Sequence, residues 1–349
     1  MIKVMVVDDS ALMRKIITRI LNSDNEIDVV MTARDGIDSL EKIIRQKPDV
    51  ITLDVEMPRM DGVETLKRLR KQFPEIPVVM ISSLTTENAE LTLKCLELGA
   101  FDFVHKPSSK SIDMSIESVS DKIVDRVKKA FENKDKLSNV TPILIEDKTT
   151  LEKKELKTNL TKLVCIGIST GGPNALMKLI PRLPTDLSAS ILIVQHMPAG
   201  FTKAFSERLD KMSKLHIKEA EDGDKCIDGR VLIAPGDFHM KVRRQGIDLV
   251  VELNKGEKVN RHRPSADILF LSAAENFGRR TLGVIMTGMG NDGAEHLGDI
   301  RKAGGYTIAQ DENSSVVYGM PRTAVELDNV DKVLPLKDIY REIIDFSEK

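Results

Sequence analysis

Short runs of apolar, mostly β-branched residues alternate with helical stretches over most of the chain. This alternation is typical of parallel sheets covered by helices, because a parallel connection needs a crossover that is usually a helix. In the first part of the chain it predicts the strands Ile2–Val7, Asp28–Met31, Val50–Leu53, Val78–Ser82 and Asp102–Val104, and helices that start near Ala11, Gly36, Gly62, Asn88 and Ile112. We therefore expect a doubly wound, flavodoxin-like α/β domain, whose ligands lie beyond the carboxyl ends of its strands.

A second α/β region follows a polar interruption. Residues 134–162 are rich in Lys, Glu, Thr and Asp, which predicts a solvated connector with a helical piece around Leu151–Leu156. Beyond it we expect the strands Leu163–Ile168, Ser190–Gln195, Val231–Ala234 and Thr281–Met286, the helices Asn174–Leu179, Ala199–Leu209, Ala266–Phe277 and Asp292–Ala303, and a β-hairpin of Met240–Val242 and Asp248–Glu252. The sequence thus predicts a first domain at 1–131, a linker at 132–161 and a Rossmann-like domain with an inserted hairpin at 162–349.

The bulk composition excludes several classes of protein. Charged residues make up 30% of the 349 residues and the net charge is -2, so no overall charge attracts nucleic acid or an anionic membrane. No apolar run approaches the ~18 residues of a membrane span, and Met1 leads directly into a strand without a signal peptide. Three scattered cysteines do not form a disulfide framework or a thiolate metal site. We expect a cytoplasmic protein with no nucleic-acid partner and no direct membrane insertion.

Polar side chains follow the strands of the first region where each strand ends. Asp8 and Asp9 follow the first strand, Asp54 the third, Ser82 the fourth and Lys106 the fifth. Clustered carboxylates repel one another unless a cation joins them, and hard oxygen ligands suit Mg²⁺. A carboxylate beside that cation can accept a phosphoryl group. The sequence therefore predicts a magnesium site facing a nucleophilic Asp54, with Lys106 and Ser82 placed to contact phosphoryl oxygens.

These positions resemble the receiver domain of two-component response regulators. The stretch from Asp54 to Gly62 adds a Met-Pro and an Asp-Gly where that family has them. Any one of these aspartates alone would fit a charge on a solvated loop, but five matching residues at the strand ends do not fit that explanation. The resemblance implies phosphorylation of Asp54 by a histidine kinase, Mg²⁺ ligands at Asp8, Asp9 and Asp54, and a phosphorylation switch formed by Ser82, Phe103 and Lys106.

The second region opens on a Gly-Ile-Ser-Thr-Gly turn. The apolar run before it and Pro173 after it place Ser169 on a sharp strand-to-helix elbow, beside backbone N–H groups and the positive end of a helix dipole. We interpret Ser169 as a candidate nucleophile. The string alone also fits a glycine-rich turn that binds phosphate or merely closes a βα unit.

Two further predicted strands bring a histidine and a carboxylate to the same sheet edge. His196 follows one of them and Asp292 lies in the loop after the other. We interpret His196 as the general base and acid, and Asp292 as the carboxylate that orients it. The N–H of Met289 is the first candidate oxyanion donor, with Thr170 and Gly171 as alternatives. The other histidines, His105, His216, His239, His262 and His296, are interpreted as structural or surface residues.

The combination resembles the family of chemotaxis protein-glutamate methylesterases. A receiver and a linker precede Gly-Ile-Ser-Thr-Gly-Gly-Pro, Gln-His-Met-Pro and Thr-Gly-Met-Gly-Asn-Asp-Gly-Ala. The resemblance implies a phosphorylation-activated serine esterase that needs no cofactor for hydrolysis and removes methyl groups from glutamates on the cytoplasmic domains of methyl-accepting chemoreceptors, for sensory adaptation. Many members also deamidate receptor glutamines, and the sequence leaves open whether this chain does so.

Two other functions are disfavoured by the residues. A DNA-binding response regulator needs a helix-turn-helix with a basic face, and none stands out after the linker. A nucleotide-binding Rossmann module needs Gly-x-Gly-x-x-Gly at its first turn and an acidic residue at the end of the next strand, where Gln195 and His196 stand instead.

Overall fold

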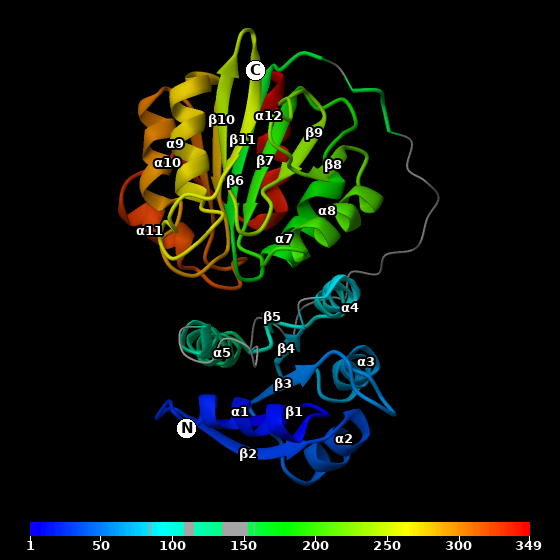
Figure 1. Cartoon of the computed structure of the whole chain (residues 1–349). Coiled ribbons are helices and arrows are strands. Elements are labelled where there is room, and N and C mark those ends of the chain that lie inside the picture. The colour runs from blue at the N-terminus through cyan, green and yellow to red at the C-terminus, as the bar shows by residue number, and fades with distance from the viewer. Residues whose placement is uncertain (84, 108–114, 135–152, 157) are drawn as a thin grey trace. The chain divides into compact units, whose positions relative to one another are not determined.

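The computed structural model describes the chain except for residues 84, 108–114, 135–152 and 157. The chain divides into two compact units, Met1–Leu144 and Ile145–Lys349 (Figure 1). Among the described residues, no helix has both the length and the apolar character that crossing a membrane requires.

The first unit is a five-stranded parallel sheet in the order β2-β1-β3-β4-β5. Its strands are β1 (Ile2–Val7), β2 (Ile27–Ala33), β3 (Val50–Asp54), β4 (Val78–Ser82) and β5 (Asp102–His105). Its helices are α1 (Ala11–Leu21), α2 (Gly36–Arg45), α3 (Gly62–Gln72), α4 (Thr86–Glu97) and α5 (Ser115–Glu132). The strand order reverses between β1 and β3, and this switch point is where an open α/β sheet forms its binding crevice.

Side-chain caps fix the starts of the first four helices. Ser10, Asp35, Asp61 and Thr85 each accept a hydrogen bond from the backbone N–H three residues later. The predicted starts of α1, α2 and α3 are confirmed, and α4 begins two residues before Asn88 because Thr85 caps it. The predicted start of the fifth helix at Ile112 lies outside the described residues.

The second unit is built on a seven-stranded sheet in the order β14-β13-β12-β6-β7-β9-β8, in which every described pair is parallel. Its strands are β6 (Lys162–Ile168), β7 (Ala189–Gln195), β8 (His216–Glu219), β9 (Arg230–Ile233), β12 (Thr281–Ile285), β13 (Tyr306–Gln310) and β14 (Lys332–Leu334). Its helices are α7 (Gly172–Leu179), α8 (Phe201–Met212), α9 (Ala266–Phe277), α10 (Ala294–Lys302), α11 (Met320–Glu326) and α12 (Leu336–Glu348), with short 3₁₀ turns at Ile180–Arg182 and Gly278–Arg280. In Figure 1, α9 and α10 cover one face of this sheet, and α7, α8 and α12 cover the other.

The predicted hairpin forms a separate two-stranded antiparallel sheet, β10 (His239–Gln245) and β11 (Asp248–Asn254). Met240, Val242, Leu249 and Val251 on it are buried in one core with the apolar side chains of α9. The hairpin is predicted from two mainly apolar runs, Met240–Val242 and Asp248–Glu252, that a polar, glycine-containing stretch separates. Five elements are not predicted from the sequence, namely β8, β13, β14, α11 and α12. Three of them, β8, β14 and α11, are too short to give a clear periodic pattern.

The predicted helix at Leu151–Leu156 does not form at residues 153–156, where the structure describes the chain. Partners on the second unit bind this segment instead. The ammonium of Lys153 contacts Asp210 Oδ1, and His216 Nε2 lies 2.7 Å from the carbonyl oxygen of Lys154. A single helical turn makes too few internal hydrogen bonds to compete with such contacts.

Gly62 holds the start of α3 against the strand that ends in Asp54. A Cβ at this position would lie 2.2 Å from the carbonyl oxygen of Asp54 and 2.8 Å from the Cα of Val55. Since both are backbone atoms, Gly62→Ala must move α3 or β3, and we expect it to destabilise the first unit by about 1–3 kcal/mol. Calorimetric unfolding of the full chain tests this, with Lys67→Ala on the exposed side of α3 as control. A Gly62→Ala transition at the wild-type temperature would contradict the expected clash.

Candidate functional site

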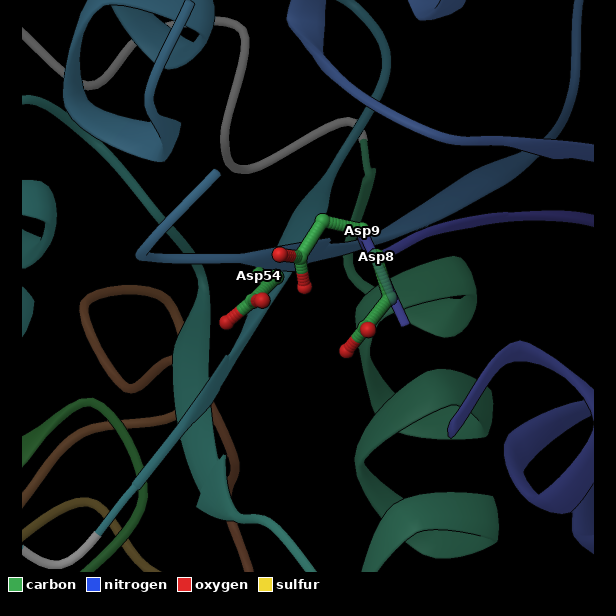
Figure 2. A group of neighbouring side chains, drawn as sticks. All are labelled: Asp8, Asp9 and Asp54. Carbon is green, nitrogen blue, oxygen red and sulfur yellow. The ribbon is translucent and has the colours of Figure 1, made fainter. Parts of the chain in front are cut away.

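Three carboxylates meet at the switch point of the first unit (Figure 2). Oxygens of Asp8, Asp9 and Asp54 all lie within 4.8 Å of one another. Asp8 and Asp54 are buried and Asp9 is exposed. Lys106, which follows β5, places its Nζ 2.6 Å from Asp54 Oδ2 and 3.0 Å from Asp8 Oδ2. The structure therefore brings together the carboxylates and the lysine that sequence analysis singled out.

The electrostatics of this acidic cluster favour an added cation. Burial raises the pKa of Asp54 to about 6, and the charges of Asp8 and Asp9 act in the same direction, although Lys106 opposes them. The pKa of Lys106 is also raised, because the two carboxylates outweigh the effect of burial. Apart from the 3.0 Å ion pair with Lys106 Nζ, Asp8 Oδ2 has no polar partner among the described residues. An oxygen-only donor set in which one buried carboxylate oxygen has a single cationic partner fits a hard divalent cation such as Mg²⁺.

Ser82 and Phe103 lie on the neighbouring strands. Ser82 is buried at the end of β4, where its Oγ accepts a 2.8 Å hydrogen bond from Thr92 Oγ1 on α4. The backbone N–H of Lys106 donates to the carbonyl of Ser82 (2.8 Å), so these two predicted residues are tied together. Phe103 is half-buried on β5 and pairs in register with Met80 of β4. Thr92, which sequence analysis did not single out, links Ser82 to α4.

Ser169 lies at the switch point of the second sheet. It follows β6, which pairs with β12 on one side and β7 on the other. Its N–H donates to the carbonyl of Thr287 (3.0 Å) and its carbonyl accepts from the N–H of Gly172 (2.8 Å). Gly171, directly before α7, has a left-handed φ of 75°. A residue with a side chain would adopt this φ only at an energetic cost. This geometry is the strand-to-helix elbow that the sequence predicts.

His196 and Asp292 form a buried pair beside this elbow. Ile168 pairs with Gln195, so Ser169 and His196 each follow one of two paired residues. His196 Nε2 lies 2.7 Å from Asp292 Oδ2, and the two side chains are 7% and 1% exposed. Among the described residues, His196 Nδ1 has no hydrogen-bond partner. The imidazole is thus anchored through one nitrogen and leaves the other available to exchange a proton.

Asp292 accepts several hydrogen bonds besides the contact with His196. Ser265 Oγ donates to Oδ1, the N–H of Ala266 at the start of α9 donates to Oδ2 (2.7 Å), and Asn260 Nδ2 donates to Oδ1 (3.2 Å). Burial opposes ionisation, but His196, Ser265 and the N–H of Ala266 outweigh it and hold the pKa of Asp292 well below its usual value. Asp292 therefore stays ionised at neutral pH, as a carboxylate that stabilises an imidazolium must.

His262, which is interpreted from the sequence as a structural or surface residue, lies against His196. Its ring stacks on that of His196, with the centroids 3.8 Å apart and the planes 7° from parallel. Sequence analysis found no strand end to place His262 near the site, because it lies in the loop between β11 and α9. The signal that was available is the run His262-Arg263-Pro264-Ser265, which is similar to the corresponding run of the methylesterase family.

The candidate oxyanion donors flank Ser169. A Cβ at Gly288 would lie 2.8 Å from the Cβ of Ser169, so the backbone next to Met289 passes directly beside the serine. Among the described residues, the backbone N–H groups of Met289 and Thr170 have no acceptor. Two free N–H groups close to a serine are suited to bind a developing negative charge.

Two family models match the sequence. The model for the CheB methylesterase matches residues 164–343, and the model for the response regulator receiver domain matches residues 4–119. The resemblance to both families and the expected pair of α/β domains are thereby confirmed.

Known proteins are similar over nearly the whole chain. The protein-glutamate methylesterase/protein-glutamine glutaminase of Pyrococcus horikoshii is 47% identical over 98% of this chain and 93% of its own length. Its counterpart numbered 2 in Koribacter versatilis is 48% identical over 96% of this chain and 93% of its own length. The crystal structure of the Thermotoga maritima CheB methylesterase catalytic domain is 44% identical and covers 53% of this chain and 97% of that chain, with a TM-score of 0.52.

Proposed function

The chain belongs to the family of CheB methylesterases that carry a response regulator receiver domain, and from this premise we propose that Ser169, His196 and Asp292 hydrolyse glutamyl methyl esters on the cytoplasmic domains of chemoreceptors. The observation that carries the proposal is the buried His196–Asp292 hydrogen bond at the sheet edge where Ser169 follows β6. We place this reaction in the cytoplasm, where the receptor glutamates are exposed.

The proposed reaction has two steps. Ser169 Oγ attacks the ester carbonyl while His196 Nδ1 takes its proton, and the N–H groups of Met289 and Thr170 bind the oxyanion. The proton then passes to the departing methoxide, which leaves as methanol. His196 then takes a proton from water, which attacks the acyl carbon. The bond between that carbon and Ser169 Oγ breaks, His196 returns the proton to Oγ, and the receptor side chain is released as a glutamate. The same steps release ammonia from a glutamine, which supports the deamidation that the names of the relatives state.

The acidic cluster is proposed to control this activity. Asp8, Asp9 and Asp54 would hold Mg²⁺, which when bound neutralises charge on the incoming phosphoryl group. Asp54 accepts the phosphoryl group from the histidine kinase, Lys106 contacts its oxygens, and Ser82 and Phe103 respond by reorienting. Phosphorylation then raises the activity of the second unit.

Methanol release from a methylated chemoreceptor fragment tests the proposal. We expect release by the full chain that increases with a small phosphodonor and Mg²⁺. A folded protein that releases no methanol in any of these conditions would refute the proposed substrate.

Replacing Asp292 by alanine is expected to slow methanol release by about 10³- to 10⁴-fold, less than the loss of the nucleophile, because Asp292 orients His196 and does not bond to the substrate. The measurement is kcat at saturating fragment. Asp299→Ala is the matched control, since Asp299 binds another histidine, His296, through a 2.7 Å contact on α10. Loss of activity in the control, or full activity in Asp292→Ala, would contradict the assigned role.

A further inference from the structure

The loop between β11 and α9 contains a tight turn directly beside the triad. Val259 and His262 exchange two backbone hydrogen bonds of 3.1 and 2.8 Å, which leaves Asn260 and Arg261 as a two-residue connection. Both connecting residues have positive φ, 50° and 66°. Positive φ at both positions defines a type I′ turn, in which asparagine is favoured and arginine is not. The conformation of this turn is therefore favoured by Asn260 but not by Arg261, and the surrounding contacts hold it in place.

The turn directs the Asn260 amide at two buried carboxylates. Asn260 Nδ2 donates to Asp267 Oδ2 (2.6 Å) and to Asp292 Oδ1 (3.2 Å). Asp267 is 3% exposed and Asp292 1% exposed. Two negative charges this close repel each other in a buried site unless a donor lies between them. Asn260 is that donor.

The same loop also contacts His196, the hydrogen-bond partner of Asp292. The ring of His262 at the end of the turn stacks on His196, while Ser265 and the N–H of Ala266 bind Asp292. One short segment, residues 259–266, thus contacts both His196 and Asp292, so a shift of the turn would displace both catalytic groups together.

We propose that Asn260 is a positioning residue for the triad, whose amide orients the Asp292 carboxylate toward His196 and separates it from Asp267. This inference rests on the proposed function. The competing explanation is that Asn260 is present only because it suits the backbone of a type I′ turn.

Two substitutions separate these explanations. Asn260→Gly retains a residue that adopts positive φ freely and removes the amide. Asn260→Asp retains the size and tolerance of positive φ but replaces the donor with an oxygen that repels both carboxylates. We expect kcat to fall by about 10- to 100-fold in Asn260→Gly, with KM changed by less than about 2-fold, and to fall further in Asn260→Asp. If Asn260 only forms the turn, kcat should fall less in Asn260→Asp than in Asn260→Gly, because aspartate is the closer replacement for asparagine.

The assay is methanol release by the full chain from a methylated chemoreceptor fragment, with thermal unfolding of each variant. Asn159→Gly is the matched control, because Asn159 Nδ2 also donates to a buried carboxylate, Asp228 Oδ2 (2.8 Å), at the start of β6. We expect this control to keep kcat within about 2-fold of wild type.

The outcomes are distinguishable. Wild-type kcat in Asn260→Gly, a milder loss in Asn260→Asp than in Asn260→Gly, or an equal loss in Asn159→Gly would each overturn the positioning role while leaving the proposed function intact. Absence of Ser169-dependent methanol release by the wild-type chain would overturn the proposed function, and the positioning role with it.

Discussion

Replacing Ser169 by alanine is expected to lower the rate of methanol release from a methylated receptor fragment by about 10⁴- to 10⁶-fold. The reason is that no acyl-enzyme can form without the hydroxyl, and the remaining oxyanion donors and binding contacts supply only the residual catalysis seen when a triad is disabled. The fold should survive, because the hydrogen bonds that hold the elbow use the backbone N–H and carbonyl of Ser169. The measurement is single-turnover methanol release at equal concentrations of folded protein.

A control variant and a double variant make this prediction more specific. Ser206→Ala removes another buried serine hydroxyl, which donates within α8 to the carbonyl of Lys203, and should leave the rate unchanged. His196→Ala should lose about as much as Ser169→Ala, and the double variant should lose little more, because the two side chains act as a unit. Additive losses in the double variant, or near-normal release by Ser169→Ala, would exclude the serine mechanism.

The strand ends explain why so much of both sites was predictable. A side chain at the carboxyl end of a parallel strand has its position fixed by the sheet, and the sheet is readable from apolar runs that match the burial of β1, β3, β6 and β7. The three carboxylates of the first unit and the Ser169–His196 neighbours follow from that rule alone.

Residues in loops could not be placed by reasoning from strand ends. A two-residue turn places His262 and Asn260 at the site. Hydrophobic periodicity does not predict the direction of the side chains in a turn. Ser265 stands directly before α9, a position typical of a capping serine, yet its hydroxyl donates to Asp292 and makes no cap. These contacts depend on long-range packing between β11, α9 and the loop after β12, which becomes visible only when the chain is folded.

Replacing Asp54 by asparagine is expected to abolish phosphoryl transfer to the first unit and with it the increase in methanol release caused by a phosphodonor and Mg²⁺. An amide cannot form the acyl phosphate, although it retains the size of the carboxylate and can still accept a hydrogen bond from Lys106. The measurement is incorporation of labelled phosphate together with the ratio of release rates with and without donor. Asp28→Asn, on β2 at the opposite end of the sheet, is the control and should respond like wild type.

Thermal unfolding of Asp54→Asn shows whether this variant has lost only phosphoryl transfer or has also lost its fold. Burial raises the pKa of Asp54 to about 6, above the value of ~3.9 in an unfolded chain, so the folded state binds the proton more tightly. Charged Asp54 therefore destabilises the fold above pH 6, by up to about 3 kcal/mol, and this penalty disappears as the pH falls below about 4. In the absence of divalent cations, Asp54→Asn should accordingly unfold at a higher temperature than wild type at pH 7.5, and the difference should shrink toward pH 4. A variant that ignores the phosphodonor while showing this pattern has lost the phosphoryl acceptor and kept its structure, whereas a response equal to that of wild type would refute control through Asp54.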